Sequence, residues 1–143
     1  MTAKEYFRSV RKAERALWLI RQQQQHAFDM AVRLSGQSET HIRTPGARSM
    51  VENAAIRLAD LDSSMQEEIS QYMALVEQAR QIIKEIPQER FREVLTLRYL
   101  CGHTWKTISD EMDYSGEKSV YKVHGWALQA AQKILSKVMP NDT

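Results

Sequence analysis

This chain of 143 residues has a formal net charge of +2 and 27% charged residues, but it contains only five glycines and three prolines. Average composition predicts roughly 17 glycines and prolines together. Their scarcity excludes β-sandwiches and small barrels, which need frequent turns, and nucleotide-binding folds, which need a glycine-rich loop. We therefore expect an all-α protein.

The composition also bears on the compartment and on cofactors. Cys101 is the single cysteine, so an internal disulfide is excluded, and no cluster of Cys and His has the spacing of a zinc site. The longest apolar run, residues 16–20, is far shorter than the roughly 20 residues of a membrane span, and the amino end lacks a signal peptide's apolar core. We expect a cytoplasmic protein without a membrane segment, metal or cofactor.

The charge is distributed unevenly along the chain. Residues 1–21 carry a net charge of +4 and residues 22–50 carry +1, whereas residues 51–90 carry −4 and residues 91–143 carry +1. The positive end of the chain is therefore its amino terminus.

A heptad pattern begins near the amino terminus and predicts a long first helix. Its positions are Tyr6, Val10, Ala13, Leu17, Ile20, Gln24, Ala27, Ala31 and Leu34, and only Gln24 is polar. The pattern stops at Ser35-Gly36, where glycine suits a helix end. Residues 37–46, bordered by glycines and rich in Ser and Thr, are predicted to form a loop.

A second heptad series predicts another long helix, from about residue 47 to residue 86. Its positions are Val51, Ala55, Leu58, Asp62, Met65, Ile69, Tyr72, Val76, Ala79, Ile83 and Ile86, and only Asp62 is polar. Pro87 closes this helix because the residue before a proline is pushed out of the α region.

The two series predict an antiparallel, coiled-coil-like hairpin over residues 1–86 that serves as a scaffold or oligomerisation domain. With the loop centred on residue 41, Ala27 pairs with Ala55 and Leu17 with Met65, and the two series stay in phase. The basic first helix would then lie along the acidic second one. Residues 77–86 extend beyond the first helix and need some other cover.

Residues 87–143 are predicted to form a separate domain of three shorter helices. The first covers residues 88–100 and ends at Gly102, and the second is capped by Thr104. A turn at residues 113–116 leads to the last helix, about residues 116–138, before Pro140. A short helix, a tight turn and a longer helix form a helix-turn-helix.

These helices resemble the fourth region of sigma-70-type transcription factors. The matching residues are Leu95-x-Leu97-Arg98-Tyr99-x-x-Gly102-x-Thr104, Ile108-Ser109-x-x-Met112 and Val120-Tyr121-x-x-His124-x-x-Ala127-Leu128. With the hairpin, the whole chain resembles small phage-encoded late transcriptional regulators of the ArpU and RinA type. One departure is an apparent extra residue, Gly116, just before the last helix. The resemblance implies a DNA-binding protein of the bacterial host cell that acts near promoters, and it leaves open whether the protein also contacts RNA polymerase.

The last helix has one apolar face and one polar face. At 100° per residue, the side of the helix with Val120 carries the core stripe, which includes His124 as a packed histidine. The opposite side carries Lys118, Lys122 and Gly125, with Ser119 and Trp126 on a flank.

Lysines bind phosphates or guanine edges, glycine permits a close backbone approach, and the first residues of a recognition helix reach the bases. We expect Lys118, Ser119 and Lys122 in the major groove, with Gly125 and Trp126 beside them. Lys106 and the helix end capped by Thr104 are expected to hold phosphate.

Other residues of this region have structural interpretations. Trp105 is interpreted as a core residue rather than as a base-stacking one. Arg98 either contacts DNA or pairs with an acidic neighbour. Apart from His103, no group near Cys101 would activate its thiol, and no nucleophile–base pair or pair of carboxylates has a usable spacing. We therefore expect no enzymatic activity.

Together these patterns predict a sequence-specific DNA-binding regulator of transcription, and the resemblance implies that it is an activator of phage late genes. The weak positive charge of the last domain favours a dimer or higher oligomer, because few phosphate contacts give little affinity alone. Two other functions fit the same pattern. One is a DNA-packaging component similar to small terminase subunits, which also join a helix-turn-helix to oligomerisation helices. The other is an interaction protein that binds RNA polymerase or a sigma factor without contacting DNA.

Overall fold

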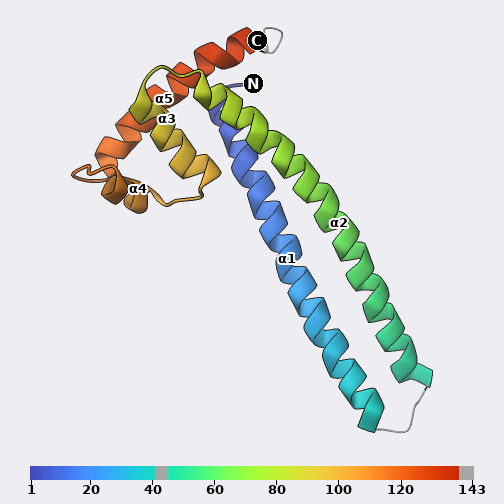
Figure 1. Cartoon of the computed structure of the whole chain (residues 1–143). Coiled ribbons are helices and arrows are strands. Elements are labelled where there is room, and N and C mark those ends of the chain that lie inside the picture. Colours follow the sequence, from blue (N-terminus) through green and yellow to red (C-terminus); the bar gives the residue numbers. More distant parts are fainter. Residues whose placement is uncertain (41–44, 139–143) are drawn as a thin grey trace. The chain divides into compact units, whose positions relative to one another are not determined.

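The computed structural model is helical throughout, apart from short connections, in the part of the chain that it describes. It describes residues 1–40 and 45–138, with side chains for residues 1–34 and 50–138. The helices are α1 (Ala3–Thr40), α2 (Pro45–Lys84), α3 (Glu89–Leu95), the π-helical turn η1 (Thr96–Leu100), α4 (Trp105–Glu111) and α5 (Glu117–Val138) (Figure 1). This confirms the all-α fold, in which a long helical hairpin precedes a helix-turn-helix. No helix in the described ranges is both long and apolar enough to cross a membrane.

The chain divides into two compact units. The helix-turn-helix unit consists of residues 1–13 and 72–143, and the hairpin unit consists of residues 14–71. The boundary predicted at residues 86 and 87 lies inside the helix-turn-helix unit, because both ends of the hairpin contribute to the core of that unit.

The core of the helix-turn-helix unit draws on segments that lie far apart in sequence. Its largest fully buried side chains are Phe7, Val10, Ile86, Val94, Leu95, Ile108 and Val120. The Phe7 ring lies 5.0 Å from that of Tyr99, and the Tyr6 hydroxyl donates a hydrogen bond to Gln78 Oε1 at 3.1 Å. The first three turns of α1 and the last turns of α2 are therefore integral parts of this core. Residues 77–86, which were predicted to extend beyond the first helix, are covered because they pack into the same buried cluster as α3–α5.

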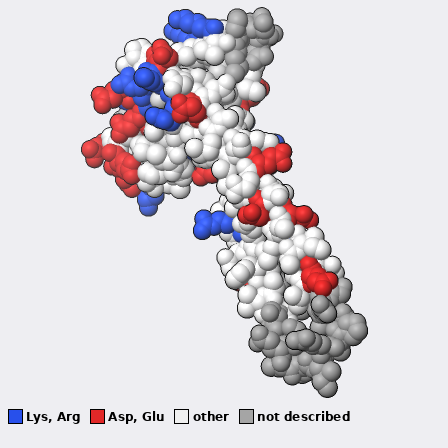
Figure 2. Space-filling model, turned by 45° about the vertical axis from the view of Figure 1, so that its right-hand side comes forward, with Lys and Arg blue, Asp and Glu red and all other residues white. Residues whose placement is uncertain are grey.

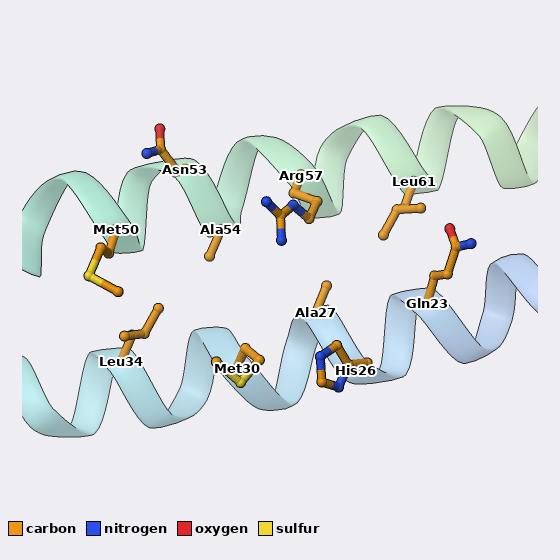
Figure 3. Close-up of a pocket in the computed structure, with 10 residues that line it drawn as sticks. All are labelled: Gln23, His26, Ala27, Met30, Leu34, Met50, Asn53, Ala54, Arg57 and Leu61. Atoms are coloured by element: carbon orange, nitrogen blue, oxygen red, sulfur yellow. The ribbon is translucent and has the colours of Figure 1, made fainter.

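The hairpin unit is much more open. Among its described side chains, Ala27 is the only buried one, with 7% of its surface exposed. A groove of about 620 Å³ runs between its helices, and Figure 3 shows Met30 and Leu34 of α1 facing Met50 and Ala54 of α2. Two helices alone give each apolar stripe one neighbour, so most inward side chains stay half-exposed.

The predicted register of α2 is right at most positions. Val51, Leu58, Met65, Tyr72 and Val76 are half-buried, and Ala79 and Ile83 are buried, as expected. Three positions were wrong by one residue, because Ala55, Asp62 and Ile69 are exposed whereas Ala54, Leu61 and Glu68 are half-buried. A step of three residues after Val51 and Leu58, instead of four, keeps the Asp62 carboxylate in water, and burying a carboxylate without a partner is costly.

The predicted ends of the long helices also need correction. Helix α1 continues through Gly36 to Thr40, and α2 begins at Pro45, so most of the predicted loop over residues 37–46 is helical. Extending a formed helix adds one hydrogen bond per residue, whereas a glycine inside it costs only about 1 kcal/mol. Pro45 occupies the first helical position, which needs no N–H donor. Residues 41–44 lie outside the described residues.

Hydrogen bonds at the helix ends shape the connections around α4. The predicted helix over residues 88–100 becomes α3 and then widens into η1, where the Cys101 N–H donates to Thr96 O at 2.9 Å. Gly102 follows with φ 70°, a conformation that favours glycine. At the other end of α4, the Tyr114 N–H donates to Ser109 O at 2.9 Å, and Asp113 adopts φ 57°. This is a Schellman-type end, and α5 starts at Glu117, one residue after the predicted start.

Candidate nucleic-acid interface

Helix α5 separates a buried face from an exposed one. Its buried side chains are Val120, Val123, Ala127, Ala131 and Leu135. Lys118 and Lys122 lie on the opposite side of the helix, and both are exposed. The predicted core stripe is confirmed, and the two lysines lie where a partner outside the chain can reach them.

The other predicted contact residues differ in exposure. Trp126 is 45% exposed, and Lys106 is exposed as well, whereas Ser119 and Gly125 are half-buried. Most of the predicted contact residues therefore lie on α5, whereas Lys106 lies on the neighbouring helix α4.

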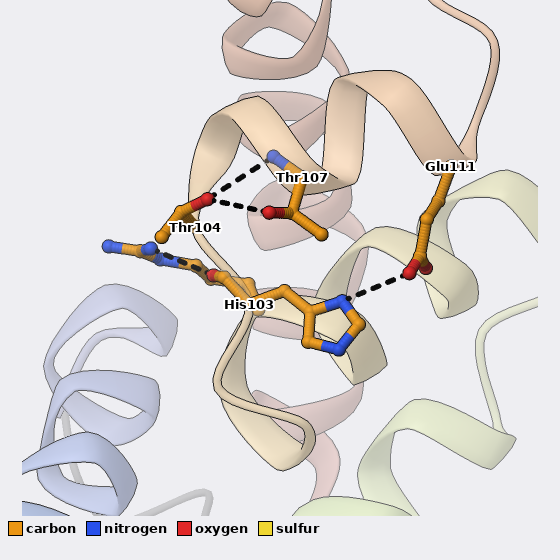
Figure 4. A network of polar contacts seen from close by, with 5 residues as sticks. His103, Thr104, Thr107 and Glu111 are labelled. Atoms are coloured by element: carbon orange, nitrogen blue, oxygen red, sulfur yellow. Dashed lines mark hydrogen bonds and ion pairs between the residues drawn. The ribbon is translucent and has the colours of Figure 1, made fainter.

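Thr104 caps α4, as its position in the sequence predicted. Its Oγ1 accepts a hydrogen bond from the Thr107 N–H at 3.2 Å and lies 2.9 Å from Thr107 Oγ1. Next to this cap, Nδ1 of His103 lies 3.6 Å from a carboxylate oxygen of Glu111 (Figure 4). These contacts hold the first turn of α4 in place, and a DNA contact by the Thr104 hydroxyl stays a prediction.

An aromatic cluster supports the amino-terminal half of α5. The Trp105 ring lies edge-on to Tyr121 and His124, with centroids 5.4 and 4.7 Å away. Nε2 of His124 lies 2.7 Å from the Tyr99 hydroxyl. Trp105 is half-buried, so the core interpretation of Trp105 and the packed interpretation of His124 are both supported.

Arg98 is fixed by stacking and by a backbone acceptor. Its guanidinium carbon lies 4.1 Å from the Trp105 ring centroid, and its Nη1 donates to the backbone oxygen of His103 at 3.0 Å. Burial and then the nearby charge of Arg11 lower the pKa of Arg98. From the sequence, an acidic residue was considered as a partner of Arg98, but the structure places the Trp105 ring beside it instead. Sequence reasoning did not place Arg98 beside α5, since only the fold brings η1 against this helix.

A second cation lies near the flank of α5. The guanidinium carbon of Arg90 is 5.5 Å from the ring centroid of Trp126 and 5.3 Å from that of Phe91. Both Arg90 and Trp126 are exposed. Sequence reasoning missed Arg90, because its position in α3 does not reveal that it lies over Trp126.

Protonation of His124 is expected to destabilise the protein. Burial, followed by the charges of Arg98 and Lys4, lowers the pKa of His124 to about 4, from about 6.5 in an unfolded chain. The stabilisation is complete above about pH 6.5 and is lost as the pH falls toward 4, because only the unfolded state then takes up the proton. The ring is partly exposed, so solvent screening limits the loss to about 1–2 kcal/mol.

Urea unfolding between pH 7 and pH 4.5 measures this loss. The His124→Phe variant should lose less stability than the wild type over the same interval. Equal losses in the two proteins would mean that other groups account for the pH dependence.

Gly125 offers a test of close DNA approach. A Cβ at this position would meet no heavy atom within 4 Å, so packing inside the chain does not require glycine. We expect Gly125→Ala to raise stability by about 1 kcal/mol and to weaken DNA binding, because the methyl group would intrude on the interface. Thermal unfolding and DNA titration measure the two effects, and unchanged binding would remove Gly125 from the proposed surface.

Charge alone does not mark this surface. In the face shown in Figure 2, Asp and Glu are spread along the hairpin unit, and on the helix-turn-helix unit Lys and Arg lie among acidic residues. This view contains no broad basic patch, so the contact surface has to be identified residue by residue.

Comparison of the chain with protein-family models, with curated proteins and with solved structures gives no significant match. The resemblance to ArpU- and RinA-type regulators therefore stays a prediction from the sequence.

Proposed function

We propose that this protein binds double-stranded DNA sequence-specifically through α5 and regulates transcription without enzymatic activity. One observation carries the proposal: α5 packs by one face into a helix-turn-helix core and presents the exposed Lys118 and Lys122 on the other. A recognition helix needs this division, because its inner face fixes the helix and its outer face reads the groove. With the family resemblance, it suggests an activator of phage late genes that also contacts RNA polymerase.

We further propose that the protein acts as a homodimer held together by the hairpin unit. Among its described side chains this unit exposes large apolar groups, including 48% of Trp18, 54% of Val32 and 60% of Ile56. A second hairpin packed alongside would cover such groups in a four-helix bundle. Dimerisation would also place two recognition helices on paired half-sites, which compensates for the few phosphate contacts of one unit.

Selection of bound fragments from the source genome, read by sequencing, tests the DNA-binding function. Enrichment of one site upstream of structural genes would support a late-gene regulator. Uniform recovery of fragments would contradict sequence-specific binding.

Light scattering of the full chain tests the assembly. The chain has a mass of 16.6 kDa, and a particle of twice this mass is expected. A ring of roughly eight or more subunits would instead favour a DNA-packaging component with closed cyclic symmetry.

A further inference from the structure

The amino-terminal segment changes the charge of the helix-turn-helix unit. Residues 72–143 contain ten Lys and Arg and nine acidic residues, a net charge of +1. Residues 1–13 add four Lys and Arg and one acidic residue, which raises the unit to +4. The hairpin unit, residues 14–71, contains six basic and eight acidic residues. The basic end of the chain therefore belongs to the unit with the recognition helix.

Specific contacts place the first turns of α1 along α5. The Ala3 N–H donates to Oε1 of Gln132 in the carboxy-terminal half of α5 at 2.6 Å. One turn further along α1, Phe7 lies against Tyr99, which in turn reaches His124 nearer the start of α5. The first turns of α1 thus contact α5 at Gln132 and η1 at Tyr99, and Tyr99 links them to His124 of α5.

Two arginines follow Phe7 at the point where α1 reaches η1. Arg11 lies one helical turn after Phe7 and so on the same side of α1, and its charge lowers the pKa of Arg98. The charges of Arg11 and Arg8 also lower the pKa of Tyr99, although burial raises that pKa overall. Because Phe7 packs on Tyr99, and Tyr99 is the neighbour of Arg98 in η1, α1 brings Arg8 and Arg11 to the part of η1 that carries Arg98.

No ion pair with either arginine is found among the described residues. The described residues do form ion pairs between Arg80 and Glu77 and between His103 and Glu111. Neither of these pairs includes an arginine of α1. Arg8 is exposed and Arg11 is half-buried, so their guanidinium groups can bind an anion from outside.

We propose that Arg8, Arg11 and Arg98 form a phosphate-binding surface that holds the DNA backbone beside the groove occupied by α5. The inference rests on the proposed DNA binding and assigns to α1 a role in it. One guanidinium group can donate two parallel hydrogen bonds to two oxygens of a phosphate. The guanidinium of Arg98 is already oriented by Trp105 and by the His103 carbonyl. Such contacts raise affinity for every DNA sequence and position the recognition helix without reading bases.

Salt dependence of DNA binding tests this role. In the Arg8→Gln/Arg11→Gln variant, the slope of log K against log salt should become shallower by about 1.8, the value for two lost phosphate contacts. Affinity for the selected site and for unrelated DNA should fall by the same factor. Arg8→Lys/Arg11→Lys, which keeps the charge, should retain most of the slope. Arg21→Gln/Arg33→Gln, two exposed arginines of the same helix in the hairpin unit, is the matched control and should leave the slope unchanged.

The outcomes separate this inference from the proposed function. An unchanged slope in the Arg8/Arg11 variant, with circular dichroism showing an intact fold, would overturn the phosphate surface while DNA binding by α5 stood. An equal change in the Arg21/Arg33 control would overturn it too, since the effect would then reflect general charge. Absence of DNA binding by the wild-type protein at low salt would overturn both proposals.

Discussion

Replacing Lys118 and Lys122 together with alanine is expected to weaken binding to the selected DNA site by about 30-fold or more, since each good base contact contributes about 1–3 kcal/mol. Both side chains are exposed on the outer face of α5, close to its start at Glu117. The opposite face, with Val120 and Val123, stays buried, so the fold should be unaffected. Fluorescence anisotropy with the selected site and with a scrambled site of equal length measures the loss.

The same helix supplies the control. Lys133 and Lys137 are also exposed on α5 but lie near its carboxyl end. Since the first residues of a recognition helix reach the bases, Lys133→Ala/Lys137→Ala should reduce affinity by much less and without preference for the selected site. If the two double variants lose binding equally, α5 does not read DNA with its amino-terminal turns. If neither double variant loses binding, the result would favour the alternative in which the protein binds RNA polymerase or a sigma factor without contacting DNA.

Replacing Phe7 with alanine should destabilise the helix-turn-helix unit by about 3–5 kcal/mol, the usual cost of removing a buried aromatic ring. Phe7 has no exposed surface, and its ring lies between those of Tyr6 and Tyr99, with centroids 5.3 and 5.0 Å away. A loss of this size is comparable to the whole stability of a small domain. We therefore expect the variant to lose DNA binding through unfolding, although Phe7 lies more than 100 positions before the recognition helix.

Urea unfolding in a Trp18→Phe background measures this effect, because the two remaining tryptophans, Trp105 and Trp126, both belong to the helix-turn-helix unit. Phe28→Ala is the matched control. Phe28 lies on the same helix but is 56% exposed and belongs to the hairpin unit. Its replacement should change the stability of the helix-turn-helix unit by less than about 0.5 kcal/mol. Equal effects of the two substitutions would contradict the place of Phe7 in this core.

Several features could be predicted from the sequence because they depend on neighbours within one helix. The caps and breaks around α4 are local: Thr104 binds the Thr107 N–H three residues later, and Gly102 adopts a positive φ. The division of α5 into a core stripe and a lysine face follows from a period of 3.6 residues and is also local. The exposure of Lys118 and Lys122 could therefore be predicted without knowledge of the other helices.

Other features could not be predicted because two alternatives have nearly the same local energy. In α2, Val51 is followed by an alanine both three and four residues later, Ala54 and Ala55. Packing against α1 favours the first, and the same step of three after Leu58 places Leu61 inward and leaves Asp62 in water. In the same way, Gly36 marks a helix end in one context and is tolerated inside a continuing helix in another.

The all-α class, the bounds of α4 and the polar face of α5 were predictable from the sequence, since hydrogen bonds and side-chain periodicity within a helix decide these. The tertiary structure was needed to show that the basic first turns of α1 belong to the same unit as α5. It also placed Arg98 on Trp105 and Arg90 over Trp126. Burial of Phe7 and Val10 in a core shared with Tyr99 and Ile86 brings these parts together. Such burial depends on surfaces that lie far apart in the sequence, so it cannot be predicted from the pattern within a single helix.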